Sequence, residues 1–453
     1  MSFDEALVNK YDRRVARYTS YPTAPHFTSE VGPERYREWL SDLPRETPLS
    51  IYLHIPFCGA LCWYCGCQAK VVNRSGPVVS YLAHLRQEID LVLDVLGRGR
   101  PVCSMHWGGG TPNILEPADI LALAETFRER FAIDERVEFS VEVDPRILTA
   151  EQARAFARAG VTRASFGVQD FDPEVQKAIN RIQPYEKTKQ AVDAFRDAGI
   201  DRINFDLLYG LPCQTREAIE STVDQAMGLS PDRIALFGYA HVPWMRRHQR
   251  LIDESTLPDG RQRLAFARAA ARRIVEAGMV PVGLDHFAKP DDDMARALDE
   301  GRLRRNFQGY TVDPAEALIG FGASAIGSLP QGYVQNAPDV QGWRGRLDDG
   351  ELPIVRGVAL SDEDRLRRAV IERLMCELRV DLEAICETYD RPVNHFDDEL
   401  ASLAPMAEDG LIEIDGRHIR VPETGRVWVR VACAAFDQYM TGGDGQPRHS
   451  RAV

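Results

Sequence analysis

The stretch YLHIPFCGALCWYCGCQAK, residues 52–70, contains four of the nine cysteines of this 453-residue chain. Cys58, Cys62 and Cys65 follow a β-rich run at 49–55 with the spacing C-x3-C-x2-C. Cysteine thiolates ligate iron–sulfur clusters, and three of them bind three irons of a [4Fe–4S] cubane. The fourth iron then has no protein ligand and can bind a small molecule. The spacing therefore predicts an open [4Fe–4S] cluster at the end of a strand.

A structural zinc site is the alternative interpretation of these cysteines. Zinc sites of this kind are normally closed by four ligands in two paired groups, and no second pair follows here. Cys67 stands two positions after Cys65, where alternating side-chain directions make joint ligation of one cube awkward, so we interpret it as a pocket residue. The other five cysteines lie singly in apolar segments and are expected to be buried core thiols: Cys103, Cys213, Cys376, Cys386 and Cys433.

Strand-like and helix-like segments alternate after residue 48. The β-rich runs lie at 49–55, 102–107, 137–143, 163–168, 202–210, 233–240 and 280–287, with amphipathic stretches between them such as 79–96 and 218–229. This alternation indicates parallel βαβ units. Six or seven units predict an α/β fold, a partial barrel of (βα)6 type whose site lies at the carboxyl ends of the strands. The glycines at 108–110, Gly210 and Gly238 lie at or near those predicted ends.

Segments of a different character flank the predicted barrel. RYTSYPTAPHF (17–27) is typical of an ordered strap, and SDEDRLRRAVIERLM (361–375) begins with a Ser N-cap and an acidic first turn. Further helices are expected at 381–390, 397–410 and 425–440, with a hairpin at 411–421. We predict an N-terminal strap at 1–48, a barrel domain at 49–345 and a small, mostly helical, winged-helix-like cap domain at 346–453. The cap can close the barrel or bind a partner.

Composition excludes several classes of protein. The formal net charge of −13 opposes a nucleic-acid or anionic-membrane partner, because both require a basic surface. Hydrophobic residues at 44% and charged residues at 27% are ordinary for a globular protein. The first residues lack the apolar core of a secretory signal, and no run is long enough for a membrane span. We expect a cytoplasmic protein without a membrane span.

The cysteine motif, placed after a first barrel strand, resembles that of the radical SAM superfamily. Tyr64 supplies an aromatic residue before the last cysteine of the motif, and HWGGGTPNIL (106–115) resembles the superfamily's glycine motif. Within the superfamily, the chain is similar over most of its length to the oxygen-independent coproporphyrinogen III oxidases. The matching segments are RYTSYPTA (17–24), YLHIPFC (52–58), CGC (65–67), HWGGGTP (106–112), VEVDPR (141–146), GVQDF (167–171), NFDLLYGLP (204–212), YAHVP (239–243), DHFAKPDD (285–292), RRNFQGYT (304–311) and SAIG (324–327).

This resemblance implies two kinds of cofactor. Cys58, Cys62 and Cys65 would hold the [4Fe–4S] cluster, and with Tyr52 they would carry the catalysis. Two molecules of S-adenosylmethionine are implied. The first would contact Tyr52, Gly109, Glu142 and Ile326. The second would contact Tyr64, Gly110, Thr111, Gln169, Arg181, Asp206 and Ala240. The residue types suit this ligand, because carboxylates accept from ribose hydroxyls or an ammonium group and arginine binds a carboxylate.

The implied reaction is the anaerobic oxidative decarboxylation of two propionate groups of coproporphyrinogen III to vinyl groups. It yields protoporphyrinogen IX for haem biosynthesis and is driven by 5′-deoxyadenosyl radicals. An electron donor of flavodoxin or ferredoxin type, a final electron acceptor and a monomeric state are also implied. For a substrate with four carboxylates we expect arginine and polar contacts: Arg17, Tyr18, His286, Arg304, Arg305, Asn306, Gln308 and Tyr310.

Two related activities are the alternatives. A haem-binding chaperone of the same superfamily keeps the three cysteines, but typically lacks the strap and differs at the position of Cys67. A haem-degrading or haem-utilising radical methyltransferase is the other. The strap and Cys67 both favour the oxidase.

Overall fold

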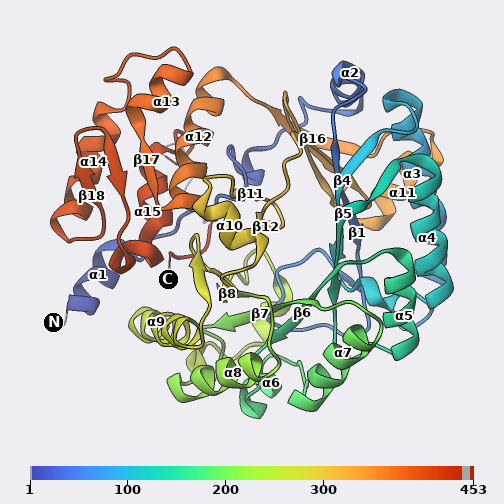
Figure 1. Ribbon diagram of the computed structural model, residues 1–453, viewed down its shortest axis with the longest axis horizontal. Helices are drawn as coiled ribbons and strands as arrows, with labels where there is room; N and C mark the ends of the chain where they lie inside the picture. The colour runs from blue at the N-terminus through green and yellow to red at the C-terminus, as the bar shows by residue number, and fades with distance from the viewer. Residues whose placement is uncertain (1–2, 441–448, 453) are drawn as a thin grey trace.

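The computed structural model describes residues 3–440 and 449–452. Its centre is a curved sheet whose six consecutive parallel strands each lead into a helix of the outer layer (Figure 1). The strands are β1 (Leu49–Ile55), β4 (Pro101–Gly109), β5 (Ala132–Val143), β6 (Arg163–Gln169), β7 (Arg202–Tyr209) and β8 (Arg233–Gly238). The helices are α3 (Gly76–Leu96), α4 (Pro117–Arg130), α5 (Ala150–Ala159), α7 (Tyr185–Asp197), α8 (Arg216–Gly228) and α9 (Gly260–Glu276). The predicted (βα)6 partial barrel is confirmed.

Further strands extend the sheet at both edges to twelve, in the order β16-β15-β14-β13-β1-β4-β5-β6-β7-β8-β10-β9. Sequence reasoning did not predict four of them, β13 (Ala317–Phe321), β14 (Ile326–Leu329), β15 (Gly332–Asn336) and β16 (Ile354–Ala359). The small elements of the barrel region are β2 (Phe57–Cys58), β3 (Lys70–Val71), α6 (Pro173–Ala178), α10 (Asp293–Asp299), β11 (Arg304–Asn306), β12 (Gly309–Thr311) and α11 (Val340–Asp348).

The strand predicted at 280–287 is wrong as a parallel barrel strand. The segment forms two short strands, β9 (Val280–Val282) and β10 (His286–Ala288), which pair antiparallel with each other. β10 also runs antiparallel to β8. Gly283 has φ +56°, and this left-handed conformation lets the chain turn back within a few residues. The barrel therefore has six βα units.

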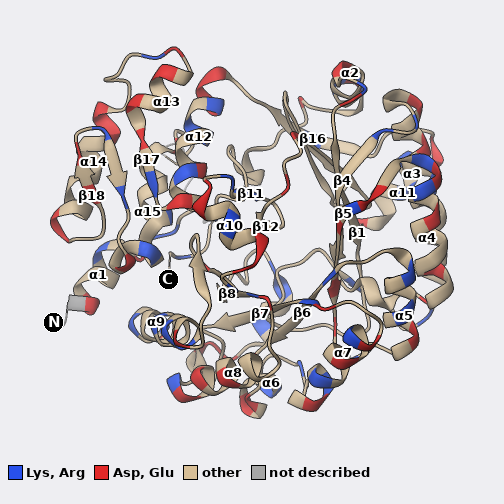
Figure 2. Ribbon diagram, viewed as in Figure 1, with Lys and Arg blue, Asp and Glu red and all other residues tan. Residues whose placement is uncertain are grey.

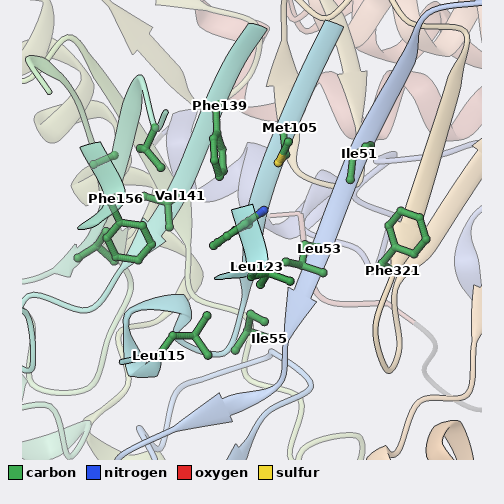
Figure 3. Packing of buried hydrophobic residues seen from close by; sticks show 14 of the residues in the cluster. Ile51, Leu53, Ile55, Met105, Leu115, Leu123, Phe139, Val141, Phe156 and Phe321 are labelled. Atoms are coloured by element: carbon green, nitrogen blue, oxygen red, sulfur yellow. The ribbon is translucent and has the colours of Figure 1, made fainter. Parts of the chain in front are cut away.

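The core lies between the sheet and its helices. Ile51 and Leu53 of β1 are fully buried and belong to the same cluster as Leu123 of α4, which lies beside Leu53, while Phe156 of α5 lies beside Val141 of β5 (Figure 3). Charged side chains gather on the outer helices, whereas the strands are mostly uncharged (Figure 2). Because helices cover one face of the sheet, buried residues recur at every second position in strands such as β5 and β6, and this local alternation made the β-rich segments readable in the sequence.

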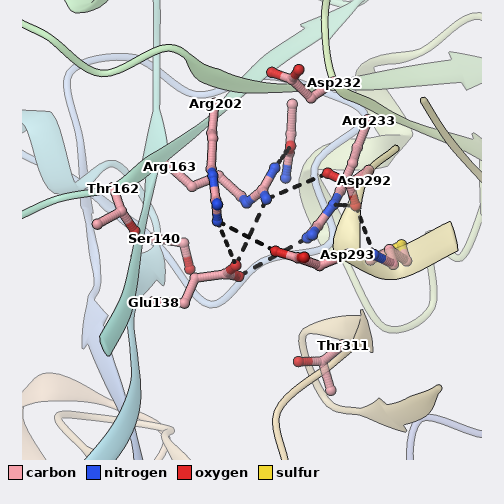
Figure 4. A network of polar contacts seen from close by, with 12 residues as sticks. Glu138, Ser140, Thr162, Arg163, Arg202, Asp232, Arg233, Asp292, Asp293 and Thr311 are labelled. Carbon is pink, nitrogen blue, oxygen red and sulfur yellow. Dashed lines mark hydrogen bonds and ion pairs between the residues drawn. The ribbon is translucent and has the colours of Figure 1, made fainter. Parts of the chain in front are cut away.

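The opposite, amino ends of β6, β7 and β8 carry an ion network. Arg163 and Arg233 contact both Glu138 of β5 and Asp292, and Arg202 contacts Glu138 and Asp293 (Figure 4). Arg163 and Arg233 are buried, so each needs such a partner. The network ties four neighbouring strands and the start of α10 together at the end of the barrel remote from the cysteines.

The C-terminal region forms a separate layer against α9 and the N-terminal segment (Figure 1). It contains α12 (Asp362–Glu377), α13 (Leu382–Thr388), α14 (Asp397–Glu408), α15 (Val429–Cys433), and the antiparallel strands β17 (Arg379–Asp381), β18 (Glu413–Asp415) and β19 (His418–Arg420). Ser361 caps α12 as predicted, and the hairpin at 411–421 is confirmed. The single helix predicted at 425–440 is wrong: it is broken into α15 between two 3-10 turns. Val429 and Val431 are β-branched and favour the helix weakly.

The N-terminal segment is ordered and divides between two cores. α1 (Phe3–Tyr11) and Val15 pack with C-terminal residues and Leu264 of α9, whereas α2 (Pro33–Asp42) packs on the barrel. The division into strap, barrel and cap stays a prediction. Because β16 still belongs to the barrel sheet, we propose the boundary between barrel and cap at about residue 360.

Among the described helices, none combines the length and apolar character that crossing a bilayer demands. Of the five cysteines expected in the core, Cys376, Cys386 and Cys433 are buried and Cys103 is partly buried. Cys213 is exposed, so the prediction is wrong there. It lies in the loop after β7 with φ +60°.

Candidate active site

The three predicted cluster ligands lie on one loop at the carboxyl end of β1. The short parallel pair of β2 and β3 closes the loop at its base, since Lys70 donates its N–H to the Pro56 carbonyl at 2.7 Å. Asn180, after α6, donates to the Leu61 carbonyl at 2.8 Å, and Gln249 donates to the Tyr64 carbonyl at 2.9 Å. The loop backbone is therefore held from three sides before any cofactor binds.

Each of these thiols receives a hydrogen bond. Thr111 donates to Cys58 Sγ at 3.4 Å, and the N–H of Cys67 donates to Cys65 Sγ at 3.4 Å. Two guanidiniums approach Cys62 Sγ, Arg181 at 3.5 Å and Arg146 at 3.6 Å. Donors and positive charge stabilise a thiolate, which is the ligating form of cysteine.

The thiols differ in how readily they ionise. Hydrogen bonds from Cys67 lower the pKa of Cys65 to about 6. Burial raises the pKa of Cys58 to about 11, although Thr111 opposes that shift. Deprotonation of Cys58 therefore depends on coupling to a bound metal.

The donor set fits a cluster better than a single ion. Within residues 3–440 and 449–452, no three His, Cys, Asp or Glu side chains lie close enough to ligate one metal ion. Ligands of one tetrahedral zinc lie about 3.8 Å apart, given Zn–S bonds of about 2.3 Å. The thiolates of a cubane each bind a different iron, so their sulfurs lie farther apart. Three thiols on one loop that line the same cavity fit a [4Fe–4S] cluster, in which each would bind a different iron.

The glycines at the end of β4 are required by close packing. Gly109 has φ +112°, and a Cβ there would lie 2.6 Å from the His54 ring. A Cβ on Gly110 would lie 2.6 Å from the Phe57 carbonyl oxygen. Larger residues would push β4 away from the strand that leads into the cysteine loop. The glycine motif therefore sets the position of the loop as well as leaving space for a ligand.

Glu142, at the end of β5, presents a carboxylate beside these glycines. Its Oε2 accepts from the Gly109 N–H at 2.9 Å, and its Oε1 lies 3.2 Å from His106 Nε2. Burial raises its pKa, but the contacts with His106 and Gly109 outweigh that effect and hold the pKa below the usual value. Tyr52 stacks on the His106 ring and bonds to His54 Nδ1 at 2.9 Å. Glu142 is thus a fixed negative charge.

Gln169 ends β6, Asp206 lies within β7, and Arg181 lies between α6 and α7. Burial, reinforced by the nearby charge of Glu142, raises the pKa of Asp206 to about 7. Gln169 has φ +70°, a strained conformation for a non-glycine residue that is often found at binding sites. Arg181 donates to the Gly167 carbonyl at 2.6 Å, while its buried Nε has no hydrogen-bond partner. That nitrogen is available to a ligand.

These groups line one cavity of about 690 Å³. It brings together the three cysteines and most of the predicted S-adenosylmethionine contacts: Tyr64, Gly109, Gly110, Thr111, Glu142, Gln169, Arg181, Asp206 and Ala240. Tyr52 and Ile326 are not among its lining residues. Tyr52 of β1 stacks on the ring of His106 of β4. Ile326 packs in a separate apolar cluster with Phe27 and Tyr333.

A second cavity of about 1510 Å³ adjoins the first, and both are lined by Arg17, Thr19, Cys67 and the segment 237–240. Of the predicted substrate residues, Arg17, Arg305 and Gln308 line this larger cavity, and Tyr18 lines the smaller one. Four others do not line either: His286, Arg304, Asn306 and Tyr310. The Tyr310 hydroxyl is engaged by protein, donating to the Met375 carbonyl at 2.6 Å.

Several residues of these cavities were missed by sequence reasoning. Asp144 and Arg146 lie in VEVDPR, and Asp285 lies in DHFAKPDD, so a fuller use of those segments would have found them. Arg263 of α9 and Arg430 of α15 carry no local signal, because each is one of many arginines on helices. Only the packing of distant segments reveals them.

The fold and the three-cysteine site together define a radical SAM protein. The family model described as the Radical SAM superfamily matches residues 52–226, and the model described as the HemN C-terminal domain matches residues 360–428.

Relatives match along nearly the whole chain. An oxygen-independent coproporphyrinogen III oxidase of Bradyrhizobium diazoefficiens is 48% identical, with 99% of each chain covered. One of Paracoccus denitrificans is 44% identical, covering 98% of this chain and 97% of the relative. The solved structure of coproporphyrinogen III oxidase (HemN) from Escherichia coli has a TM-score of 0.90 at 38% identity, covering 97% of this chain and 99% of that one. The chain belongs to the oxygen-independent coproporphyrinogen III oxidase family.

Proposed function

We propose that this chain oxidatively decarboxylates two propionate side chains of coproporphyrinogen III to vinyl groups in haem biosynthesis. The observation that carries the proposal is the 48% identity over 99% of both chains with a relative of that name. The match includes the strap, the cysteine loop and the C-terminal domain. Fold similarity alone would not identify a substrate, since one fold supports many reactions.

The reaction needs a one-electron oxidant because the propionate carboxylate has no electron sink beside it. The cluster and S-adenosylmethionine, when bound, supply a carbon-centred radical that can remove a hydrogen atom from such a C–H bond. The substrate loses that hydrogen atom from the carbon next to the pyrrole. It then loses CO2 and one electron, which converts –CH2–CH2–COO⁻ to –CH=CH2. The electron passes to an acceptor outside the chain.

The chain's own residues would hold and orient the reactants. We propose Cys58, Cys62 and Cys65 as the cluster ligands. Glu142 offers a carboxylate to an ammonium group or ribose hydroxyl, and the free Nε of Arg181 offers a donor to a carboxylate. The two cavities share lining residues, so a substrate in the larger cavity would lie next to the radical formed in the smaller one. The residues around the substrate would keep its other C–H bonds away from that radical.

We propose that two molecules of S-adenosylmethionine bind in the smaller cavity. Residues predicted to contact each molecule line this cavity. Gly109 and Glu142 are assigned to the first molecule, and Gln169, Arg181 and Asp206 are among those assigned to the second. Equilibrium dialysis of the reconstituted protein should give two bound molecules per chain.

On the basis of the family resemblance, we also propose that the protein is a cytoplasmic monomer and that a flavodoxin- or ferredoxin-like donor reduces it. Size-exclusion chromatography tests the monomeric state.

Anaerobic turnover tests the main proposal. Reconstituted protein, S-adenosylmethionine, a reductant and coproporphyrinogen III should yield protoporphyrinogen IX together with 5′-deoxyadenosine. A variant with Cys58, Cys62 and Cys65 all changed to Ala should yield neither product. Stable haem binding by the wild-type chain without any protoporphyrinogen would contradict the oxidase and support a haem chaperone.

A further inference from the structure

Four arginines from different parts of the chain line the larger cavity. Arg17 comes from the strap, Arg263 from α9, Arg305 from β11 and Arg430 from α15 of the C-terminal region. Arg430 is only 8% exposed. The side chain of Arg17 borders both cavities and so keeps accessible surface. The surrounding protein nevertheless desolvates its guanidinium, which lowers the pKa of Arg17.

None of these guanidiniums has a carboxylate partner among the described residues; their hydrogen bonds go to backbone carbonyls. Arg17 donates to Gly238 at 2.9 Å and Arg263 to Tyr239 at 2.7 Å. Arg430 donates to Ala452 at 2.5 Å and to Arg451 at 3.1 Å. Arg305 donates weakly to the Arg17 carbonyl at 3.4 Å, and its buried Nε and Nη1 have no partner. These two buried nitrogens are donors that no atom of the described residues satisfies.

Arginines outnumber acidic residues in the lining of this cavity, nine to five; the acidic residues are Asp4, Asp12, Asp259, Asp285 and Glu423. Asp285 is the acidic group that interacts with Arg17, Arg305 and Arg430, and His286 already binds it at 2.8 Å. Burial, followed by repulsion from Arg17, lowers the pKa of Arg430 to about 10. The ion network at the other end of the barrel differs, because each of its three arginines contacts a carboxylate (Figure 4). Clustered buried cations without partners are costly, so this cavity is built to receive an anion.

Aromatic side chains form another part of the cavity wall. Tyr209, Phe237, Trp244, Phe287 and Phe307 line it. Such surfaces suit the flat rings of a large organic ligand, whereas a small inorganic anion would leave them wet. The cavity thus combines several guanidiniums with a broad apolar surface, which matches a macrocycle that carries several carboxylates.

We propose that Arg263 and Arg430, together with Arg17 and Arg305, bind the substrate's carboxylates, so that the C-terminal domain contributes directly to the substrate site through Arg430. This inference rests on the proposed function. It adds two residues outside the segments that carry the family resemblance. The strap, the barrel and the C-terminal domain must all be in place before all four guanidiniums face the ligand.

Binding of a stable probe tests this assignment without turnover. Coproporphyrin III has four carboxylates and protoporphyrin IX has two, and fluorescence quenching measures the Kd of each for the holoenzyme without reductant. Arg263→Gln should weaken coproporphyrin binding about ten- to a hundredfold, the usual loss for a charged hydrogen bond, and weaken protoporphyrin binding less. Arg273→Gln is the matched control, since Arg273 lies on the same helix but is paired with Asp224 at 2.6 Å.

The outcomes separate this inference from the proposed function. Unchanged coproporphyrin affinity in Arg263→Gln, or equal losses for both porphyrins, would overturn the carboxylate assignment. The control Arg273→Gln should keep the wild-type affinity for both porphyrins; a loss as large as that of Arg263→Gln would show a nonspecific effect of changing this helix and would also overturn the assignment. Arg430→Gln should repeat the effect and Arg430→Lys should recover part of it. If Arg430→Gln does not fold, Arg263→Gln decides alone. Wild-type protein that neither binds nor converts the tetrapyrrole would contradict the proposed function itself.

Discussion

Cys67 stands where the two cavities meet, and we interpret it as a pocket residue and not as a cluster ligand. Its backbone N–H donates to Cys65 Sγ at 3.4 Å, and its side chain borders both cavities. A residue in this position can influence the thiolate of Cys65 without ligating iron. The structure places it beside the cluster loop, at the boundary with the proposed substrate cavity.

Cys67→Ser should therefore keep the cluster. The serine keeps the backbone N–H that binds Cys65 Sγ, and three thiolates remain for three irons. Iron and sulfide content after anaerobic reconstitution should equal that of the wild type, whereas Cys62→Ser should lose most of the iron. Depleted iron in Cys67→Ser would make Cys67 a ligand and reverse this interpretation.

At the scale of elements, Glu88 of α3 joins several parts of the barrel edge. Its carboxylate accepts from the Gly322 N–H at 2.8 Å, the Asn336 amide at 2.6 Å and Trp343 Nε1 at 3.1 Å. These donors belong to the turn after β13, to β15 and to α11. A single buried acid thus fixes the strands that sequence reasoning missed against a helix that it predicted.

Glu88→Ala should lower the free energy of unfolding by about 1–3 kcal/mol, because buried donors lose their acceptor. Burial raises the pKa of Glu88 to about 7, above its ordinary 4.5. The native state then holds this proton longer than the unfolded state, so the stability from this group is complete below pH 4.5 and is lost as pH rises through about 7. Denaturant titrations at several pH values should show the difference between wild type and variant shrinking from about pH 5 to about pH 8. A difference that grows with pH would contradict this account.

At the scale of the whole molecule, the N-terminal segment connects the barrel to the C-terminal domain. Leu7, Tyr11 and Val15 lie in one apolar cluster with Leu264 of α9 and Trp428 of the C-terminal domain. Arg14 pairs with Arg451 in an isolated β-bridge, which brings the two ends of the chain together. The strap therefore has a structural role in addition to its place beside the cavities.

Leu7→Ala should destabilise the protein by about 2–4 kcal/mol, the usual cost of removing a buried leucine side chain. Leu7 is 2% exposed and Arg13 is exposed, so Arg13→Ala is the control and should change stability little. Thermal unfolding followed by circular dichroism measures both. Equal stability of Leu7→Ala and the wild type would mean that the strap does not hold the C-terminal domain.

The barrel was predictable because its signals are local. The apolar runs of β1, β4, β5, β6, β7 and β8 are continuous in sequence, and the cysteine spacing lies within a single loop. The hairpin of β9 and β10 was misread because its apolar content resembles a parallel strand, and only Gly283 marks the turn. Strands β13 to β16 were missed because each has only four to six residues, too few for a clear periodic pattern. Of these strands, β13 also pairs with the distant β1, whereas β14, β15 and β16 pair with their chain neighbours.

The sequence by itself determined the six βα units and the family, and it located the three proposed cluster ligands, because each depends on the spacing of residues that are near one another in the chain. Only the tertiary structure decided which arginines share a cavity. Arg17 and Arg430 are more than four hundred positions apart, and both line the larger cavity. Whether a charged side chain has a partner depends on the packing of distant segments, and no local pattern records it.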